Sequence, residues 1–195
     1  MDVVSFIDNA INLFFDTLGV FAPIFACLLI AIESILPIMP LAVFITINFY
    51  YLGTFIGFLI SWLFTCIGCY ISYILCQKKL KKHFDYMLDK KEHKKLKKLM
   101  KRINNMSLEQ IVILMAIPFT PAFMINIAAG LSNINKKKFI ISIIIGKIFL
   151  VYFWGKIGTS LIESIKNPKI LIQIAIFVVI AFIISKIVNK KLNVE

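Results

Sequence analysis

Pro118-Phe-Thr-Pro121 interrupts the apolar segment Ile111 to Leu131, which otherwise has about the length of a transmembrane helix. Each proline removes a backbone donor, and an unsatisfied backbone group in hydrocarbon costs several kcal/mol. Lys136, Lys137 and Lys138 follow almost at once, and short basic loops favour the cytoplasmic side of a membrane. A segment that crossed would leave these lysines outside. The pattern therefore predicts a re-entrant hairpin that enters and leaves from the cytoplasm.

A related pattern occurs earlier, at Glu33-Ser-Ile-Leu-Pro37-Ile-Met-Pro40, and an apolar run follows it to Asn48. A carboxylate and two prolines within eight residues cannot form an ordinary lipid-facing helix, so we expect a second broken, re-entrant hairpin covered by protein. Two such hairpins from opposite sides, each followed by a long apolar helix, are typical of an inverted repeat. In transporters, discontinuous segments of this kind mark the binding site.

The composition places the whole chain in a membrane. Of its 195 residues 60% are hydrophobic and 16% are charged, and the mean hydropathy is +0.90. Soluble domains usually carry about 25% charged residues. At this length we expect a single membrane domain over residues 1–195, without room for a separate soluble enzyme domain. The lack of a basic start argues against a cleaved signal peptide.

The basic residues are concentrated in one stretch. The first 77 residues contain no Lys or Arg, whereas Lys78 to Arg102 contains 12, against the acidic residues Asp85, Asp89 and Glu92. The positive-inside rule places this run in the cytoplasm, where it can contact anionic phospholipid headgroups. Nucleic-acid binding is the alternative function for this stretch. A basic run between apolar spans is usually a topology signal, however, so we expect no nucleic-acid partner.

These observations predict an all-α polytopic membrane protein with about four transmembrane helices and two opposed re-entrant hairpins. We expect an amphipathic helix over residues 1–18, a first repeat over 19–76, a basic cytoplasmic helix or loop over 77–105, a second repeat over 106–161, and a last span with a basic tail over 162–195. Both termini are expected in the cytoplasm. The helix from about Asn48 to Cys76 carries small residues at every fourth position, typical of close helix packing: Gly53, Gly57, Ser61, Thr65 and Cys69.

Ionisable side chains are rare within the predicted hydrocarbon. Glu33 and Lys147 lie at depth, and Lys156 lies nearer the outside; a buried ion pair or a structural hydrogen bond is the alternative to a functional role. Lys147 is roughly 13 Å beyond Lys138 along a helix, close to the midplane. The four cysteines are expected to be free thiols. The sequence shows no catalytic set, metal site or cofactor motif, so we do not expect an enzyme.

Glu33-x-x-x-Pro37-x-x-Pro40 and Pro118-x-x-Pro121-x-x-x-x-Asn126-x-x-x-Gly130-Leu resemble the DedA family of VTT-domain (SNARE-associated Golgi protein) membrane proteins. The resemblance covers about residues 20 to 160 and implies two opposed re-entrant hairpins and movement of lipids between leaflets. Eukaryotic members are implicated in phospholipid scrambling, and some bacterial members in recycling undecaprenyl phosphate. Two departures from the family pattern, Met115 where many members have Arg and the apolar pair Leu41 and Ala42, argue against proton-coupled flipping that depends on those charges. Lys147 could supply a replacement cation.

The resulting hypothesis is a flippase-like or scramblase-like transporter of a phospholipid or a polyprenyl phosphate. The expected substrate path comprises Glu33, Pro37, Pro40, Thr46, Asn48, Pro118, Thr120, Pro121, Asn126, Gly130 and Lys147. A small-solute or ion transporter and a non-transporting membrane scaffold are the alternatives. Richness in Lys, Ile and Asn favours a bacterial plasma (inner) membrane. The sequence leaves open which lipid is moved, whether transport is energised, and whether the chain forms a homo-oligomer.

Overall fold

The computed structural model describes residues 19–36, 40–80, 94–164 and 169–192, and within these ranges the regular structure is entirely helical. The elements are the 3-10 turn η1 (Gly19–Phe21), α2 (Ala22–Ile35), α3 (Leu41–Leu75), the π-helical turn η2 (Cys76–Leu80), α5 (Lys94–Asn105), α6 (Leu108–Ala116), α7 (Ala122–Leu131), α8 (Lys136–Ser164) and α9 (Lys169–Leu192). The predicted helix over residues 1–18 and residues 81–93 of the basic stretch lie outside the described residues.

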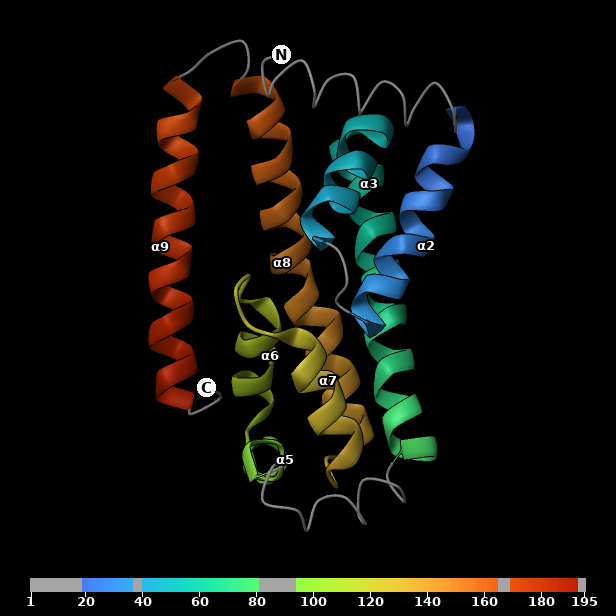
Figure 1. Ribbon diagram of the computed structural model, residues 1–195, viewed down its shortest axis with the longest axis vertical. Helices are drawn as coiled ribbons and strands as arrows, with labels where there is room; N and C mark the ends of the chain where they lie inside the picture. The colour runs from blue at the N-terminus through green and yellow to red at the C-terminus, as the bar shows by residue number, and fades with distance from the viewer. Residues whose placement is uncertain (1–18, 37–39, 81–93, 165–168, 193–195) are drawn as a thin grey trace.

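The first hairpin is formed by α2 and the beginning of α3. Pro23 lies in the first turn of α2, where its missing amide hydrogen costs nothing. α2 runs from one end of the molecule to about mid-height, and residues 41–52 of α3 run back beside it (Figure 1). At Gly53 the backbone has a φ of 77° and a ψ of 166°, so the chain turns over. Residues 54–75 then run the full height of the molecule.

The second hairpin is formed by α6 and α7, and it comes from the opposite end, which carries α5 (Figure 1). A capping box starts α6: the Gln110 amide donates to Ser107 Oγ at 3.3 Å, and the Ser107 amide donates to Gln110 Oε1 at 2.9 Å. The helix stops at Ala116, and α7 begins after Pro121. The predicted helix break at Pro118 to Pro121 is confirmed.

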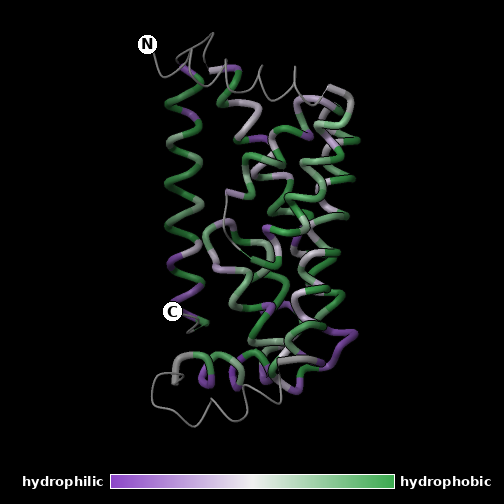
Figure 2. The backbone as a smooth tube through the Cα atoms, turned by 45° about the vertical axis from the view of Figure 1, so that its right-hand side comes forward, coloured by the Kyte–Doolittle hydropathy of each residue, from purple (hydrophilic) through white to green (hydrophobic). Residues whose placement is uncertain are grey.

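Three helices in the described part of the chain are long and apolar enough to cross a membrane: Leu41–Lys78, Lys136–Ser164 and Lys169–Leu192. Figure 2 shows their largely hydrophobic course and, at one end, a helix in which hydrophilic and hydrophobic residues alternate, which is α5. The expected count of about four is not confirmed, because α2 has only 14 residues and serves as an arm of the first hairpin. The expected start of the crossing helix at Asn48 is also wrong, since the turn comes five residues later, at Gly53.

Glycines bring two of the crossing helices, α3 and α8, each against the first arm of a hairpin. A Cβ at Gly68 would lie 2.5 Å from the Ala31 carbonyl oxygen and 2.6 Å from Ser34 Cβ. A Cβ at Gly146 of α8 would lie 2.8 Å from the Val112 carbonyl oxygen and 2.5 Å from Met115 Cβ. Neither glycine could carry a side chain without displacing the arm.

The two sets of contacts have the same spacing. Ala31 and Ser34 precede Pro40 by nine and six residues, and Val112 and Met115 precede Pro121 by the same numbers. The two hairpins therefore share one register, offset by 81 residues. This repeated contact supports the internal repeat that the Pro-x-x-Pro patterns suggested.

The predicted face of small residues is confirmed at four of its five positions. Gly57, Ser61, Thr65 and Cys69 are buried, and a Cβ at Gly57 would overlap the backbone of Asn48 and Phe49. Gly53 does not belong to this face: it is exposed, and a Cβ there would meet nothing within 4 Å. Its role is conformational, because a positive φ favours glycine. Trp62 Nε1 donates to the Ile144 carbonyl oxygen at 2.9 Å and joins the two crossing helices.

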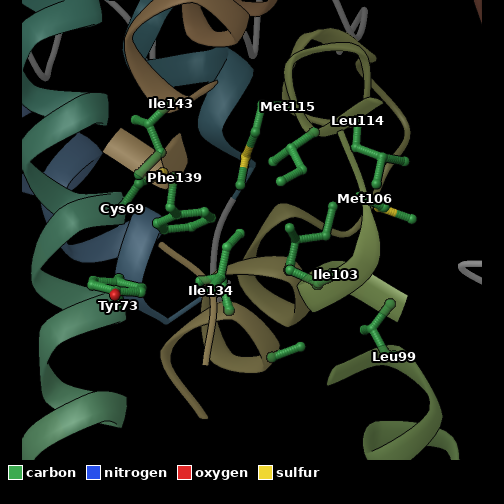
Figure 3. Close-up of a cluster of buried hydrophobic side chains, with 14 residues drawn as sticks. Cys69, Tyr73, Leu99, Ile103, Met106, Leu114, Met115, Ile134, Phe139 and Ile143 are labelled. Atoms are coloured by element: carbon green, nitrogen blue, oxygen red, sulfur yellow. The ribbon is translucent and has the colours of Figure 1, made fainter. Parts of the chain in front are cut away.

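Each hairpin has its own apolar cluster. Around the second hairpin, the rings of Tyr73 and Phe139 pack at an angle of 31° with centroids 4.8 Å apart, and Leu114, Met115 and Ile143 lie nearby (Figure 3). Around the first hairpin, the cluster comprises Ile30, Phe44, Ile45, Phe49, Leu150 and Val151. α8 contributes to both clusters, so it holds the two hairpins together.

Gly57→Leu is expected to destabilise the fold by about 1–3 kcal/mol, because the added side chain must displace the arm that carries Asn48. The measurement is the unfolding temperature in detergent, followed with a thiol-reactive dye, since Cys27, Cys69 and Cys76 are buried free thiols. Ala175→Leu, at an exposed position of α9, is the matched control and should change little. Equal effects of the two substitutions would contradict the close contact at Gly57.

Single cysteines at Asn104 and Asn133, in a Cys-free background, should both react with a membrane-impermeant reagent from the cytoplasmic side only. Both positions are exposed, and they flank the second hairpin at the same end of the molecule (Figure 1). A cysteine at exposed Glu163, at the far end of α8, should react only from outside. Labelling of Asn133 and Asn104 from opposite sides would make the second hairpin a span.

Candidate functional site

A cavity of about 360 Å³ lies where the two hairpins meet. Both hairpin tips contribute to it, together with α8 and one residue of the crossing part of α3. Its lining comprises Glu33, Ser34, Pro40, Leu41, Ala42, Cys69, Pro118, Thr120, Pro121, Ala122, Phe123, Lys147, Leu150 and Trp154. The cavity volume is within the range of about 300–1,000 Å³ that is usual for small-molecule sites.

Two helices begin at this cavity. Leu41 and Ala42 open α3, Ala122 and Phe123 open α7, and all four line the cavity. Proline occupies the N-cap position of each helix, at Pro40 and Pro121, and forms no side-chain cap. The first amide groups of a helix have no partner within the helix, and the macrodipole adds positive potential there. Two helix N-termini that converge on one cavity favour an anion.

Lys147 adds a full positive charge. Its side chain is 1% exposed, and its ammonium group makes no hydrogen bond or ion pair with any residue of the described ranges. It lies on the buried face of α8, between Ile143 of one apolar cluster and Leu150 of the other. Because a buried charge is costly unless it is paired, the ammonium group calls for an anion inside the cavity.

Glu33 is the acidic residue of the lining, and its side chain is half-buried at the end of α2. The cavity thus carries one carboxylate and one ammonium group, on α2 and α8. The sequence predicted both as intramembrane functional candidates, and the structure brings them to the same cavity.

Hydrogen bonds fix the tip of the second hairpin. Thr120 Oγ1 donates to Asn189 Oδ1 of α9 at 3.1 Å, and both side chains are buried. Asn189 Nδ2 lies 3.5 Å from Ser185 Oγ. Asn126 Nδ2 lies 3.5 Å from the Ser34 carbonyl oxygen and so joins α7 to α2. These contacts hold the two tips and α9 around the cavity.

Of the expected path residues, Glu33, Pro40, Pro118, Thr120, Pro121 and Lys147 line the cavity, and Pro37 lies outside the described residues. Asn48, Thr46, Asn126 and Gly130 do not line the cavity, so their place on a substrate path stays a prediction. Asn48 is fully buried beside Ser61, to which its Nδ2 donates at 3.0 Å. A Cβ at Gly130 would lie 2.5 Å from the Tyr73 carbonyl oxygen, so this glycine serves helix packing.

Eight further lining residues were not on the expected path: Ser34, Leu41, Ala42, Cys69, Ala122, Phe123, Leu150 and Trp154. Leu150 and Trp154 follow Lys147 by three and seven residues, which places them on the same helix face. That spacing could have revealed them. The Trp154 ring contacts Phe119 of the second hairpin edge to face, with ring centroids 5.7 Å apart.

Comparison with known proteins gives a consistent result. The model of the VTT domain matches residues 36–160. An uncharacterized membrane protein of Bacillus subtilis (strain 168), YhjE, is 27% identical over 181 residues, which cover 93% of this chain and 86% of the relative. No solved structure matches. The matched domain includes both Pro-x-x-Pro tips and most of α8, and on this match the chain belongs to the VTT-domain (DedA) family of membrane proteins.

Proposed function

We propose that this protein moves a phosphate-bearing lipid, a phospholipid or a polyprenyl phosphate, between the leaflets of a bacterial plasma membrane. The observation that carries the proposal is Lys147, a buried ammonium group without a protein partner among the described residues, in a cavity on which two helix N-termini converge. Phosphate is the lipid group that this arrangement suits best.

The disposition of the chain in the membrane follows from its charges. α5 is amphipathic and basic, and α8 begins with the exposed Lys136 and Lys137. α5 and the beginning of α8 lie at the same end of the molecule (Figure 1). We place this end in the cytoplasm. The second hairpin is then re-entrant from the cytoplasm and the first from outside, and α9 returns the C-terminus to the cytoplasm. The exposed basic side chains of α5 hold anionic headgroups of the inner leaflet.

In this proposal the headgroup passes through the cavity between the hairpins while the acyl chains remain in the surrounding lipid. Lys147 and the free amide groups of α3 and α7 replace the hydration of the phosphate. Glu33 lies at the same cavity, where it binds a headgroup amine or carries a proton. No covalent bond is made or broken, so the function is transport without catalysis.

Lys147→Met should lower lipid exchange between leaflets by about ten- to a hundred-fold. Loss of one hydrogen bond to a charged group costs about 1.5–3 kcal/mol, and 1.4 kcal/mol is a factor of ten. The assay uses purified protein in liposomes with a fluorescent phospholipid or a polyprenyl phosphate. Lys186→Met, at an exposed lysine of α9, is the matched control.

The same Lys147→Met variant separates transport from stability. Met fills a similar volume without an unpaired charge, so the unfolding temperature should stay constant or rise. A stable variant with full lipid exchange would overturn the proposal. Ion or solute flux without lipid exchange would favour the alternative of a small-solute or ion transporter.

Glu33→Gln is expected to abolish lipid exchange while the protein remains folded, because Gln keeps the shape and most hydrogen bonds of Glu. If Glu33 instead stabilises the fold through its charge, the substitution lowers the unfolding temperature, and the double change with Lys147→Met partly restores it. Full activity together with unchanged stability would exclude Glu33 from the lipid path.

A further inference from the structure

A second hollow lies between α8 and α9 and shares no lining residue with the cavity between the hairpins. Its volume is about 710 Å³. The lining comprises Ile148, Phe149, Tyr152, Phe153, Lys156, Ile157, Ser160, Ile170, Gln173, Ile174 and Phe177. We call it the α8–α9 groove. Four of its eleven lining residues come from α9, which lies beyond the VTT-domain match at residues 36–160.

The two ends of the α8–α9 groove differ in chemistry. Its polar residues gather where α8 ends and α9 begins: Lys156, Ser160 and Gln173. Toward the middle of the molecule the walls are aromatic, and the rings of Phe153 and Phe177 stack with centroids 6.4 Å apart. The groove is therefore amphipathic along its length.

The length of the groove corresponds to one leaflet. Ile148 and Ser160 are 12 residues apart on α8, which is roughly 18 Å at about 1.5 Å per residue. Half of a hydrocarbon core of about 30 Å is about 15 Å. One lipid chain can therefore lie along the aromatic walls while its headgroup reaches the polar end.

Charge determines which lipid fits. Lys156 is exposed, and its ammonium group makes no hydrogen bond or ion pair with the residues that the structure describes. The groove lining contains no acidic residue. The hydroxyl of Ser160 and the amide of Gln173 are further donors at the same end. An ammonium group with two neutral donors complements a phosphate that keeps its negative charge.

We propose that the α8–α9 groove binds one anionic phospholipid, with its phosphate at Lys156 and one acyl chain against Phe149, Phe153 and Phe177. In the orientation given under the proposed function, on which this assignment of leaflet rests, the lipid belongs to the outer leaflet. A second copy of the chain fits less well, because an apolar helix in the groove would cover Lys156 without supplying an anion. This site is separate from the transport path, and its test measures binding only.

Trp154 reports on the groove, because its ring lies 5.2 Å from that of Phe153, centroid to centroid. In a Trp62→Phe protein, Trp154 is the remaining tryptophan. The protein is reconstituted in vesicles that contain either brominated lipid at the same mole fraction. Brominated phosphatidylglycerol should quench the fluorescence of Trp154 at least twofold more than brominated phosphatidylcholine. Lys156→Gln should remove this preference, whereas Lys186→Gln, an exposed lysine further along α9, should retain it.

Three results would overturn the assignment: equal quenching by both lipids, a preference that survives Lys156→Gln, or a preference lost in Lys147→Met instead, since Trp154 also borders the cavity between the hairpins. Phe177→Cys in a Cys-free background tests the alternative occupant, a second copy of the chain. Efficient disulfide dimers there would assign the groove to a second copy. Unfolding temperatures of the Gln variants confirm that each remains folded.

Discussion

A proline within the membrane leaves backbone groups without their helical hydrogen-bond partners, and protein must cover these groups. The rest of this structure depends on that constraint. Pro40 and Pro121 each precede a helix that starts near the middle of the molecule. The crossing helices supply the cover, and Gly68 and Gly146 let them approach the hairpin arms without intervening side chains. Each hairpin is stable only beside a crossing helix, and the cavity forms where the two tips face one another.

The position of Lys147 shows how the scaffold and the site are joined. One face of α8 supplies Phe139 and Ile143 to the cluster of the second hairpin, and Leu150 and Val151 to that of the first. Lys147 occupies the point between the two clusters, where neither hairpin fills the space. The same helix thus holds the hairpins together and presents a cation to the space between them.

The breaks at Pro118 and Pro121 could be predicted from the sequence, because proline acts locally on the backbone. Glu33 and Lys147 could also be predicted, since a charge in an apolar segment is rare. The location of the first turn could not. Gly53 fits the four-residue spacing of a packing face, and only the fold shows that the chain reverses there.

Polar residues within the apolar segments were harder to assign. Asn48 and Asn126 looked like path residues, yet both hold helices together: Asn48 through Ser61, and Asn126 through the carbonyl group of Ser34. A polar side chain can serve packing or a cavity equally well, and its sequence neighbours do not distinguish the two. Trp154 carries no sign of a site by its residue type, and only its spacing of seven residues from Lys147 indicates that it belongs to the cavity.

The shortness of the hairpin arms has a consequence for biogenesis. α6 and α7 have 9 and 10 residues, about half of what a membrane span needs. Neither can integrate on its own during synthesis. The second hairpin must therefore pack after α8 has been synthesised, because α6 packs against Gly146 of α8. Gly130 of α7 packs against the end of α3, which is synthesised earlier. Assembly of this protein is thus ordered, with the long helices inserted first and the cavity between the hairpins completed last.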